Sequence, residues 1–343
     1  MKYDVTFHPS WWHKKLGIDF SQDFFDDPKY RIESDVKMRR FLYDCFGDYG
    51  IGEADPKLRP LLGSDLLACG YLYSEIMGCD IKYQKYSSPE VVCAHLLPEE
   101  CAKICVPDLD QNPVWNRMQK QIDFLTEKYG YCMPMINLMG VQNIALDLMG
   151  DELLTGYYED EESVRRVLEI ITDLCIQIGK RLKKCGNVLS GGVTAIIEKT
   201  VPEAYVTSNC SVDFIAPVTY EEFLLEYDRR LATEFSPFGV HHCGGHMERY
   251  AALYMQIPNL EFAEVGAGSD VTAVCQAMPG LFLNIRFSPV ELKSLSKHEI
   301  SKKVEMLCNS CTNPFSMSCV GIDAETPDES ICALLEAMNI QGK

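Results

Sequence analysis

The sequence is poor in positive charge and in histidine. Its 343 residues carry 32 lysines and arginines against 50 aspartates and glutamates, for a formal net charge of −18, and only 7 histidines. Such a chain repels the phosphates of nucleic acids and the anionic surface of membranes. Its first ten residues contain no long apolar run, so neither a signal peptide nor a membrane span is expected there. We expect a cytoplasmic protein that binds neither nucleic acid nor membrane.

The chain also lacks a disulfide framework. Its 16 cysteines are spread over the sequence without framework spacing, and no export signal directs them to an oxidising compartment. Free cysteine is one of the residue types most often buried. We therefore expect free thiols, most of them packed in the core, so that a functional cysteine has to be recognised by its context.

The remaining composition is typical of a folded α/β protein. Hydrophobic residues make up 47% of the chain and charged residues 24%, which excludes wholesale disorder. Beyond residue 125, short apolar runs such as "FGVHHC", "LEFAEVG", "LFLNIRF" and "PFSMSCVGI" alternate with amphipathic stretches such as "TYEEFLLEYDRRLATEF". The clearest helix is predicted over residues 160–186, with an acidic first turn, a basic last turn and Gly186 as its C-cap. Alternating short strands and long helices predict a parallel sheet with helical crossovers.

The predicted fold is a (β/α)8 TIM barrel with an elaborated N-terminal segment. Residues 1–125 are expected to cap the barrel and residues 126–343 to form its main part, the two making one structural domain. An open doubly wound sheet is the alternative, but no G-x-G-x-x-G or P-loop stands at a strand-to-helix turn. In the N-terminal segment, Trp11, Trp12 and His13 fit either an aromatic lid over the barrel mouth or, as we expect, core packing.

The stretch "GVHHCGGHMERY" (239–250) gathers three histidines and a cysteine around two glycines. If "FGV" begins a strand, His241 and Cys243 lie at its C-terminal end and point to one side, while His242 points to the other. The C-terminal ends of the strands are where a barrel keeps its chemistry. Imidazole and thiolate are good zinc ligands, but two ligands do not make a site.

Cys319 is the candidate third ligand. It ends the short apolar run "PFSMSC", expected to be the last strand of the barrel, and strand ends converge on one mouth. Ligands this far apart in sequence cannot be distinguished from a chance arrangement. From the residues alone, a structural alternative therefore stays open, in which the cysteine is simply buried and the histidine lies on the surface.

The stretch His241, Cys243, Gly244, together with "SMSCVGIDAETPDESICALLEAM" (316–338), resembles the zinc-binding pattern of the uroporphyrinogen decarboxylase superfamily, in its corrinoid-linked methyltransferase branch. The segments "DEESVRRVLEIITD" and "SVDFIAPVTYEEFLLEYDRRL" resemble further parts of the family, and the resemblance covers about residues 130–340. It implies a metal site of His241, Cys243 and Cys319, with a fourth position left for substrate, as a catalytic zinc requires.

The function implied by this resemblance is zinc-dependent transfer of a methyl group between a small methylated substrate or thiol and the cobalt of a corrinoid. No D-x-H-x-x-G corrinoid motif is present, so the corrinoid is expected on a partner protein. Two alternatives remain. One is a metal-free tetrapyrrole decarboxylase, which the stretch "PSWWHKKLGIDFSQDFF" disfavours because it lacks the family's substrate-holding arginines. The other is a non-catalytic barrel that binds metal or corrinoid.

Further site residues are predicted from their places in the chain. Glu198, a carboxylate in an apolar run, is a candidate catalytic proton source, and His242 a candidate catalytic proton shuttle or ligand-orienting group. Asn137 and Asn209, near predicted strand ends, are candidate cofactor-binding residues. For His242 and the two asparagines, a plain loop, turn or capping role is the alternative.

Overall fold

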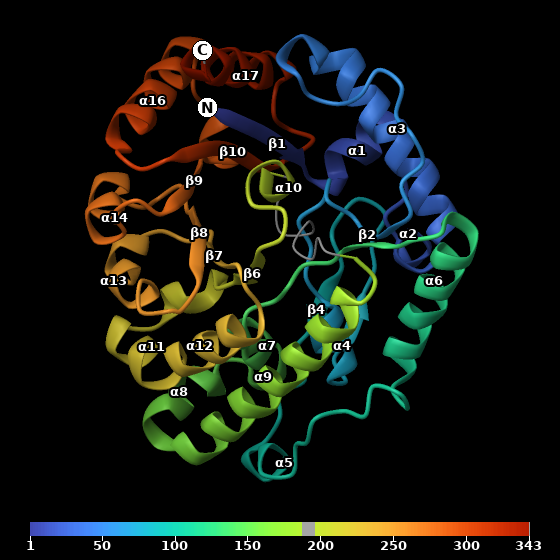
Figure 1. Ribbon diagram of the computed structural model, residues 1–343, viewed down its shortest axis with the longest axis vertical. Coiled ribbons are helices and arrows are strands. Elements are labelled where there is room, and N and C mark those ends of the chain that lie inside the picture. The colour runs from blue at the N-terminus through green and yellow to red at the C-terminus, as the bar shows by residue number, and fades with distance from the viewer. Residues whose placement is uncertain (187–195, 343) are drawn as a thin grey trace.

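The computed structural model describes residues 1–186 and 196–342, and of Ile196 and Glu198 it describes only the backbone (Figure 1). Its centre is a curled, fully parallel six-stranded sheet. In spatial order the strands are β1 (Lys2–Phe7), β10 (Phe315–Ile322), β9 (Phe282–Arg286), β8 (Leu260–Val265), β7 (Phe238–His242) and β6 (Tyr205–Ser208). The α/β class is confirmed, and helices cover the outside of the curl.

Two short strands continue the curl beyond β6. A parallel bridge joins Ser208 of β6 to Met139, just after β5 (Met133–Met135), and β5 pairs in parallel with β2 (Leu61–Gly63). Within residues 1–186 and 196–342, no ladder joins β2 back to β1, so a fully closed (β/α)8 barrel is not seen. A separate antiparallel hairpin is formed by β3 (Asp80–Lys82) and β4 (Glu90–Val92).

The helices and turns fall between these strands in chain order. In the first half they are α1 (Pro9–Leu16), α2 (Gln22–Asp26), α3 (Pro28–Phe46), the 3-10 turn η1 (Gly47–Tyr49), α4 (Leu72–Ile76), α5 (Pro98–Cys101), α6 (Pro113–Tyr129), α7 (Val141–Met149), α8 (Glu152–Glu159) and α9 (Glu161–Lys183). In the second half they are α10 (Ile196–Thr200), the 3-10 turn η2 (Cys210–Phe214), α11 (Pro217–Phe223), α12 (Leu225–Glu234), η3 (Met247–Arg249), α13 (Ala251–Tyr254), α14 (Val271–Ala277), α15 (Pro289–Leu292), α16 (Lys297–Ser310) and α17 (Asp328–Gly342).

Helix α9 confirms the predicted helix but not its predicted end. The Asp160 side chain accepts a hydrogen bond from the Ser163 amide and caps the first turn, and the basic last turn suits the helix dipole. A buried stripe that includes Val164, Leu168 and Ile171 packs into the core. The helix ends at Lys183, with Lys184 in a right-handed conformation as its C-cap, so the glycine cap predicted at Gly186 is wrong.

The N-terminal segment supplies strands as well as covering helices. β1 pairs with β10 and β2 pairs with β5, so the sheet runs across residue 125. Trp11 and Trp12 are fully buried, and the Trp11 ring stacks on Phe7 with 4.0 Å between centroids. The core-packing role expected for the tryptophans is confirmed. No helix in the described part of the chain is long and apolar enough to cross a membrane.

Candidate metal centre

The predicted strand beneath the histidine cluster is β7, and all five of its residues are buried. Val240 and His241 pair with Ala263 and Glu264 of β8 on one side, and His241 pairs with Ser208 of β6 on the other. Strand alternation sends the side chains of His241 and His242 to opposite faces of the sheet. Cys243 follows immediately, at the C-terminal edge where parallel strands present their functional groups.

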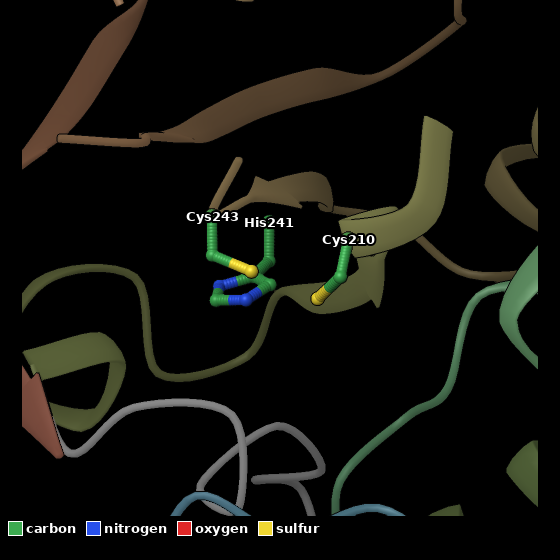
Figure 2. Close-up of side chains that lie close together, drawn as sticks. All are labelled: Cys210, His241 and Cys243. Atoms are coloured by element: carbon green, nitrogen blue, oxygen red, sulfur yellow. The ribbon is translucent and has the colours of Figure 1, made fainter. Parts of the chain in front are cut away.

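The structure brings a second cysteine to His241 and Cys243. The pairing of β6 with β7 continues past Ser208, because the Asn209 amide donates to the His241 carbonyl at 2.8 Å. Cys210 then opens η2 beside the end of β7. One ligand atom each of Cys210, His241 and Cys243 lies within 4.8 Å of the other two, and Figure 2 shows the three side chains pointing toward one another.

A carboxylate fixes the imidazole from behind. Glu264, fully buried in β8, accepts a hydrogen bond from His241 Nδ1 at 2.6 Å. Arg286 of β9 lies against the same carboxylate, with its Nε 3.3 Å from Glu264 Oε1. Because Nδ1 is held by Glu264, Nε2 is the nitrogen left to face the two sulfurs. A carboxylate, a histidine and a metal in this order is a common way to set the tautomer of a ligand.

The electrostatics of the cluster favour an anionic Cys243. A hydrogen bond from Cys210 lowers the pKa of the Cys243 thiol, and the positive charges of His241 and Arg286 lower it further, against the effect of burial. The shared hydrogen bond, followed by burial, raises the pKa of Cys210. Burial opposes protonation of His241, but Glu264 and the two cysteines together raise its pKa. One thiolate is therefore stabilised before any metal binds.

The donor set fits zinc. Two thiol sulfurs and one imidazole nitrogen, with a carboxylate behind the imidazole, are ligands typical of tetrahedral zinc. Three protein ligands leave one position for a substrate or water, which distinguishes a catalytic from a closed structural site.

Cys319 lies outside the three-residue group among the described residues. It is fully buried in β10, and burial raises the pKa of its thiol to about 12, although the charge of Arg286 acts in the opposite direction. Arg286 thus influences both Cys243 and Cys319. Cys319 as a metal ligand stays a prediction from the family resemblance.

Both ring nitrogens of His242 have hydrogen-bond partners. Its Nδ1 is 2.9 Å from the Tyr254 hydroxyl and its Nε2 is 3.0 Å from the Gly245 carbonyl oxygen. Burial lowers the pKa of His242. A neutral ring with Nε2 protonated satisfies both contacts, since it accepts from Tyr254 and donates to Gly245. These contacts give His242 a positioning role for the loop after β7, and its predicted catalytic role stays a prediction.

The other predicted site residues lie at three different places. Asn209 is buried beside the cluster, where its Nδ2 donates to Asp228 Oδ2 at 2.7 Å. Asn137 follows β5, and its Oδ1 accepts from the Ser208 hydroxyl at 2.9 Å. Glu198 falls in α10, but its side chain lies outside the described part of the structure. The cofactor-binding and catalytic roles of these three residues remain predictions.

Sequence reasoning missed Cys210 and Glu264. Nothing in "SNCSVD" marks Cys210, because it meets Cys243 only through the pairing of β6 with β7. For Glu264, the sequence does contain a local indication of a functional role. It is an acid inside the apolar run "FAEV", and a fully buried carboxylate requires a partner on a neighbouring strand.

Backbone contact links the loops that follow β7 and β8. A Cβ atom at Gly266 would lie 1.7 Å from the Gly244 carbonyl oxygen, so only glycine fits there. Side chains add to the contact, since the Met247 amide donates to Ser269 Oγ at 3.1 Å and the Asp270 amide to Glu248 Oε2 at 3.0 Å. The loop that carries Cys243 is therefore held against its neighbour.

Comparison with known proteins supports this architecture. Residues 65–339 match the family uroporphyrinogen decarboxylase (URO-D). Among solved structures, a methyltransferase from Methanosarcina mazei superposes with a TM-score of 0.67, at 16% sequence identity, over 99% of this chain and 94% of its own. At this identity the likeness concerns the fold. No curated protein matches the sequence significantly.

Proposed function

The chain belongs to the uroporphyrinogen decarboxylase family, and from this premise we propose that it is a zinc-dependent methyltransferase. The methyl group would pass between a small methylated substrate or thiol and the cobalt of a corrinoid carried by a partner protein. The observation that carries the proposal is the cluster of Cys210, His241 and Cys243, backed by Glu264. The name of the structural neighbour, a methyltransferase, agrees with it.

The residues of the cluster suit this reaction. Cys210 and Cys243 would hold zinc by their sulfurs and His241 by Nε2, whereas the family resemblance implies Cys319 in the place of Cys210; either set leaves one position open for a substrate. A bound zinc would act as a Lewis acid that lowers the pKa of a thiol or improves the leaving group that carries the methyl. Glu264 keeps the His241 proton on Nδ1, so that Nε2 stays free to bind.

Arg286 balances the negative charge of the site. Its guanidinium lies against Glu264 and lowers the pKa of Cys243, so it offsets part of the charge that two thiolates and a carboxylate bring together. We propose that it also supports an anionic substrate group or thiolate at the remaining ligand position.

The decarboxylase alternative finds less support in the N-terminal segment. Arg31 is buried and donates to the carbonyl oxygens of Phe25 and Leu61. Arg39 pairs with Asp35 at 2.8 Å. These two arginines bind groups of the protein itself, whereas a decarboxylase of this family needs arginines to hold the carboxylates of its substrate.

Metal analysis of protein purified without chelators or a metal-binding tag tests the proposal. We expect about one zinc per chain, and its loss in Cys243→Ala and Cys210→Ala. Cys105→Ser is the matched control, because Cys105 is exposed and outside the cluster. Cys319→Ala, compared with Cys210→Ala, decides which of the two cysteines is the third ligand. Folded wild-type protein free of zinc would overturn the metal assignment.

Turnover separates an enzyme from a binder. The zinc-loaded protein is incubated with methylcobalamin and thiols, and with cob(I)alamin and methylated compounds, and the cobalamin spectrum is followed. We expect methyl transfer that disappears with the metal. Stoichiometric zinc without any turnover, with the physiological corrinoid protein included, would favour the non-catalytic alternative.

A further inference from the structure

A cavity is lined by residues of the β2–β5 pair and of helices α2, α4 and α6, elements whose places in the fold are seen in Figure 1. Its described lining includes none of Cys210, His241, Cys243 and Glu264. Its volume is about 60 Å³. Since one water occupies roughly 10–15 Å³ on this measure, the cavity holds about four to six water-sized groups. This is the size of a small organic molecule.

Two aromatic rings form part of the wall. Phe25 of α2 and Tyr71, just before α4, both line the cavity and meet edge to face with 5.4 Å between centroids. Tyr83 packs behind them, 5.8 Å from Phe25 and 5.9 Å from Tyr71 between centroids. Leu62 and Met118 make other parts of the wall apolar. A ligand in this cavity would lie against aromatic rings and aliphatic side chains.

Three charged side chains also line the cavity, and their charges do not add up to zero. Arg117 lies between Asp26, at 3.0 Å, and Glu75, at 2.6 Å. Two carboxylates and one guanidinium leave one negative charge. The second oxygen of Glu75, Oε2, is buried and has no hydrogen-bond partner among the described residues. An anionic oxygen in this state calls for a positively charged or proton-donating partner.

The charges around the cavity also act on the hydroxyl of Tyr83. Burial raises the pKa of its hydroxyl, and the charges of Glu75 and Asp26 raise it further, while Arg117 acts in the opposite direction. The two carboxylates therefore outweigh the guanidinium at this point.

We propose that the cavity binds a small methylated ammonium ion. The positive charge would lie near Glu75 Oε2, and its N-methyl groups would lie against Phe25 and Tyr71. Aromatic faces attract such cations through their quadrupole, and a nearby carboxylate adds a direct charge interaction. A neutral molecule of the same size without a hydrogen-bond donor would leave the Glu75 oxygen unpaired, and one with a donor would still leave its negative charge unbalanced.

The cavity adjoins the strands that carry the metal centre. Asn137 lines it and accepts a hydrogen bond from Ser208 of β6, the residue paired with His241. To serve as a methyl donor, a methylated ammonium bound here would have to pass from this cavity to the metal centre. That use rests on the proposed function, whereas the binding itself does not.

Isothermal titration calorimetry on the full-length protein tests the binding. The probe is tetramethylammonium chloride, with tert-butanol as its neutral analogue of the same size and potassium chloride as the salt control. We expect tetramethylammonium to bind at least about tenfold more tightly than tert-butanol. Equal binding of the two, or no binding of tetramethylammonium, would overturn the proposal.

Two pairs of variants locate the site. Glu75→Gln keeps an acceptor for Arg117 but removes the charge, and we expect roughly tenfold weaker binding. Glu325→Gln, at an exposed position, is its control. Tyr71→Leu removes a ring and should weaken binding, whereas Tyr71→Phe should retain it. Unchanged affinity in both Glu75→Gln and Tyr71→Leu would overturn the site.

One further variant separates this proposal from the proposed function. Cys243→Ala should lose zinc and still bind tetramethylammonium with unchanged affinity. If binding disappears together with the zinc, the cation binds at the metal centre and the cavity proposal is wrong. If the wild-type protein has no zinc but binds the cation through Glu75, the proposed function fails and the cavity proposal stands.

Discussion

Two pairs of cysteines lie close together in this protein, and their surroundings differ. Cys210 and Cys243 share their site with His241, Glu264 and Arg286. The sulfurs of Cys275, in α14, and Cys311, just after α16, are 3.5 Å apart. Burial raises the pKa of Cys311 to about 12, and the neighbouring thiol raises it too. The first pair is accompanied by an imidazole held by a carboxylate and by adjacent positive charge, and these are the features on which the proposed metal site rests.

The largest expected effect separates the two pairs by metal content. Cys243→Ala should remove essentially all bound zinc, because it removes one of the three proposed ligands, the one whose thiol pKa is lowered. Cys311→Ala should retain all of it. Inductively coupled plasma mass spectrometry on both variants gives the answer, and equal zinc in the two would remove the basis of the comparison.

A difference in thiol reactivity is expected in metal-free protein. The lowered pKa of Cys243 keeps its thiolate populated at pH 6, whereas the raised pKa of Cys311 keeps that thiol protonated. Alkylation by iodoacetamide at pH 6, followed by mass spectrometry, should be at least about a hundredfold faster at Cys243. Raising the pH to 8 should accelerate Cys311 and leave Cys243 nearly unchanged. Similar rates at pH 6 would contradict the assignment of the thiolate.

The carboxylate of Glu264, behind His241, should make a smaller contribution to zinc affinity. Glu264→Gln leaves all ligands in place but weakens the hold on His241 Nδ1, and we expect zinc affinity to fall by roughly 10–100-fold. Competition with a chromogenic chelator measures the affinity. Glu261→Gln, an exposed site on the same strand, is the control and should not change it. An unchanged affinity in Glu264→Gln would mean that the imidazole is held by other contacts.

The smallest expected effect is on stability and concerns Asp228, the buried carboxylate that accepts a hydrogen bond from Asn209. Burial raises the pKa of Asp228 from 3.8 to about 6, although hydrogen bonds from Tyr220 and Asn209 act in the opposite direction. The folded protein then holds this proton more tightly than the unfolded chain, so this group's contribution to stability falls as the pH rises from about 4 to about 6 and is constant above.

Asp228→Asn should remove that dependence and raise the free energy of unfolding at pH 7 by on the order of 1–2 kcal/mol. Urea denaturation at pH 4.5 and pH 7 measures it. Asp80→Asn, at an exposed position of β3, is the control. A destabilised Asp228→Asn at pH 7 would show that the carboxylate is needed in its charged form.

Patterns within a single segment could be predicted from the sequence, and contacts between segments could not. The period of residues 160–186 predicted α9, and the apolar run before His241 predicted β7, which also explains why His241 and His242 separate. Cys210 was missed because its partner is set by strand pairing rather than by local spacing. Closure of the predicted barrel is not seen among the described residues, and β2 and β5, with three residues each, are too short to carry a period.

The contact of Gly266 with the Gly244 carbonyl has a consequence for the motions of the site. Because the loops after β7 and β8 touch through their backbones, they are expected to open as one unit. Removing a metal held by Cys243 would then release amides well beyond its ligands. The Ser269 side chain and the Asp270 amide both hydrogen-bond to the loop after β7. Hydrogen exchange at Ser269 and Asp270 would therefore report whether a metal occupies the centre, although their own loop carries none of the proposed ligands.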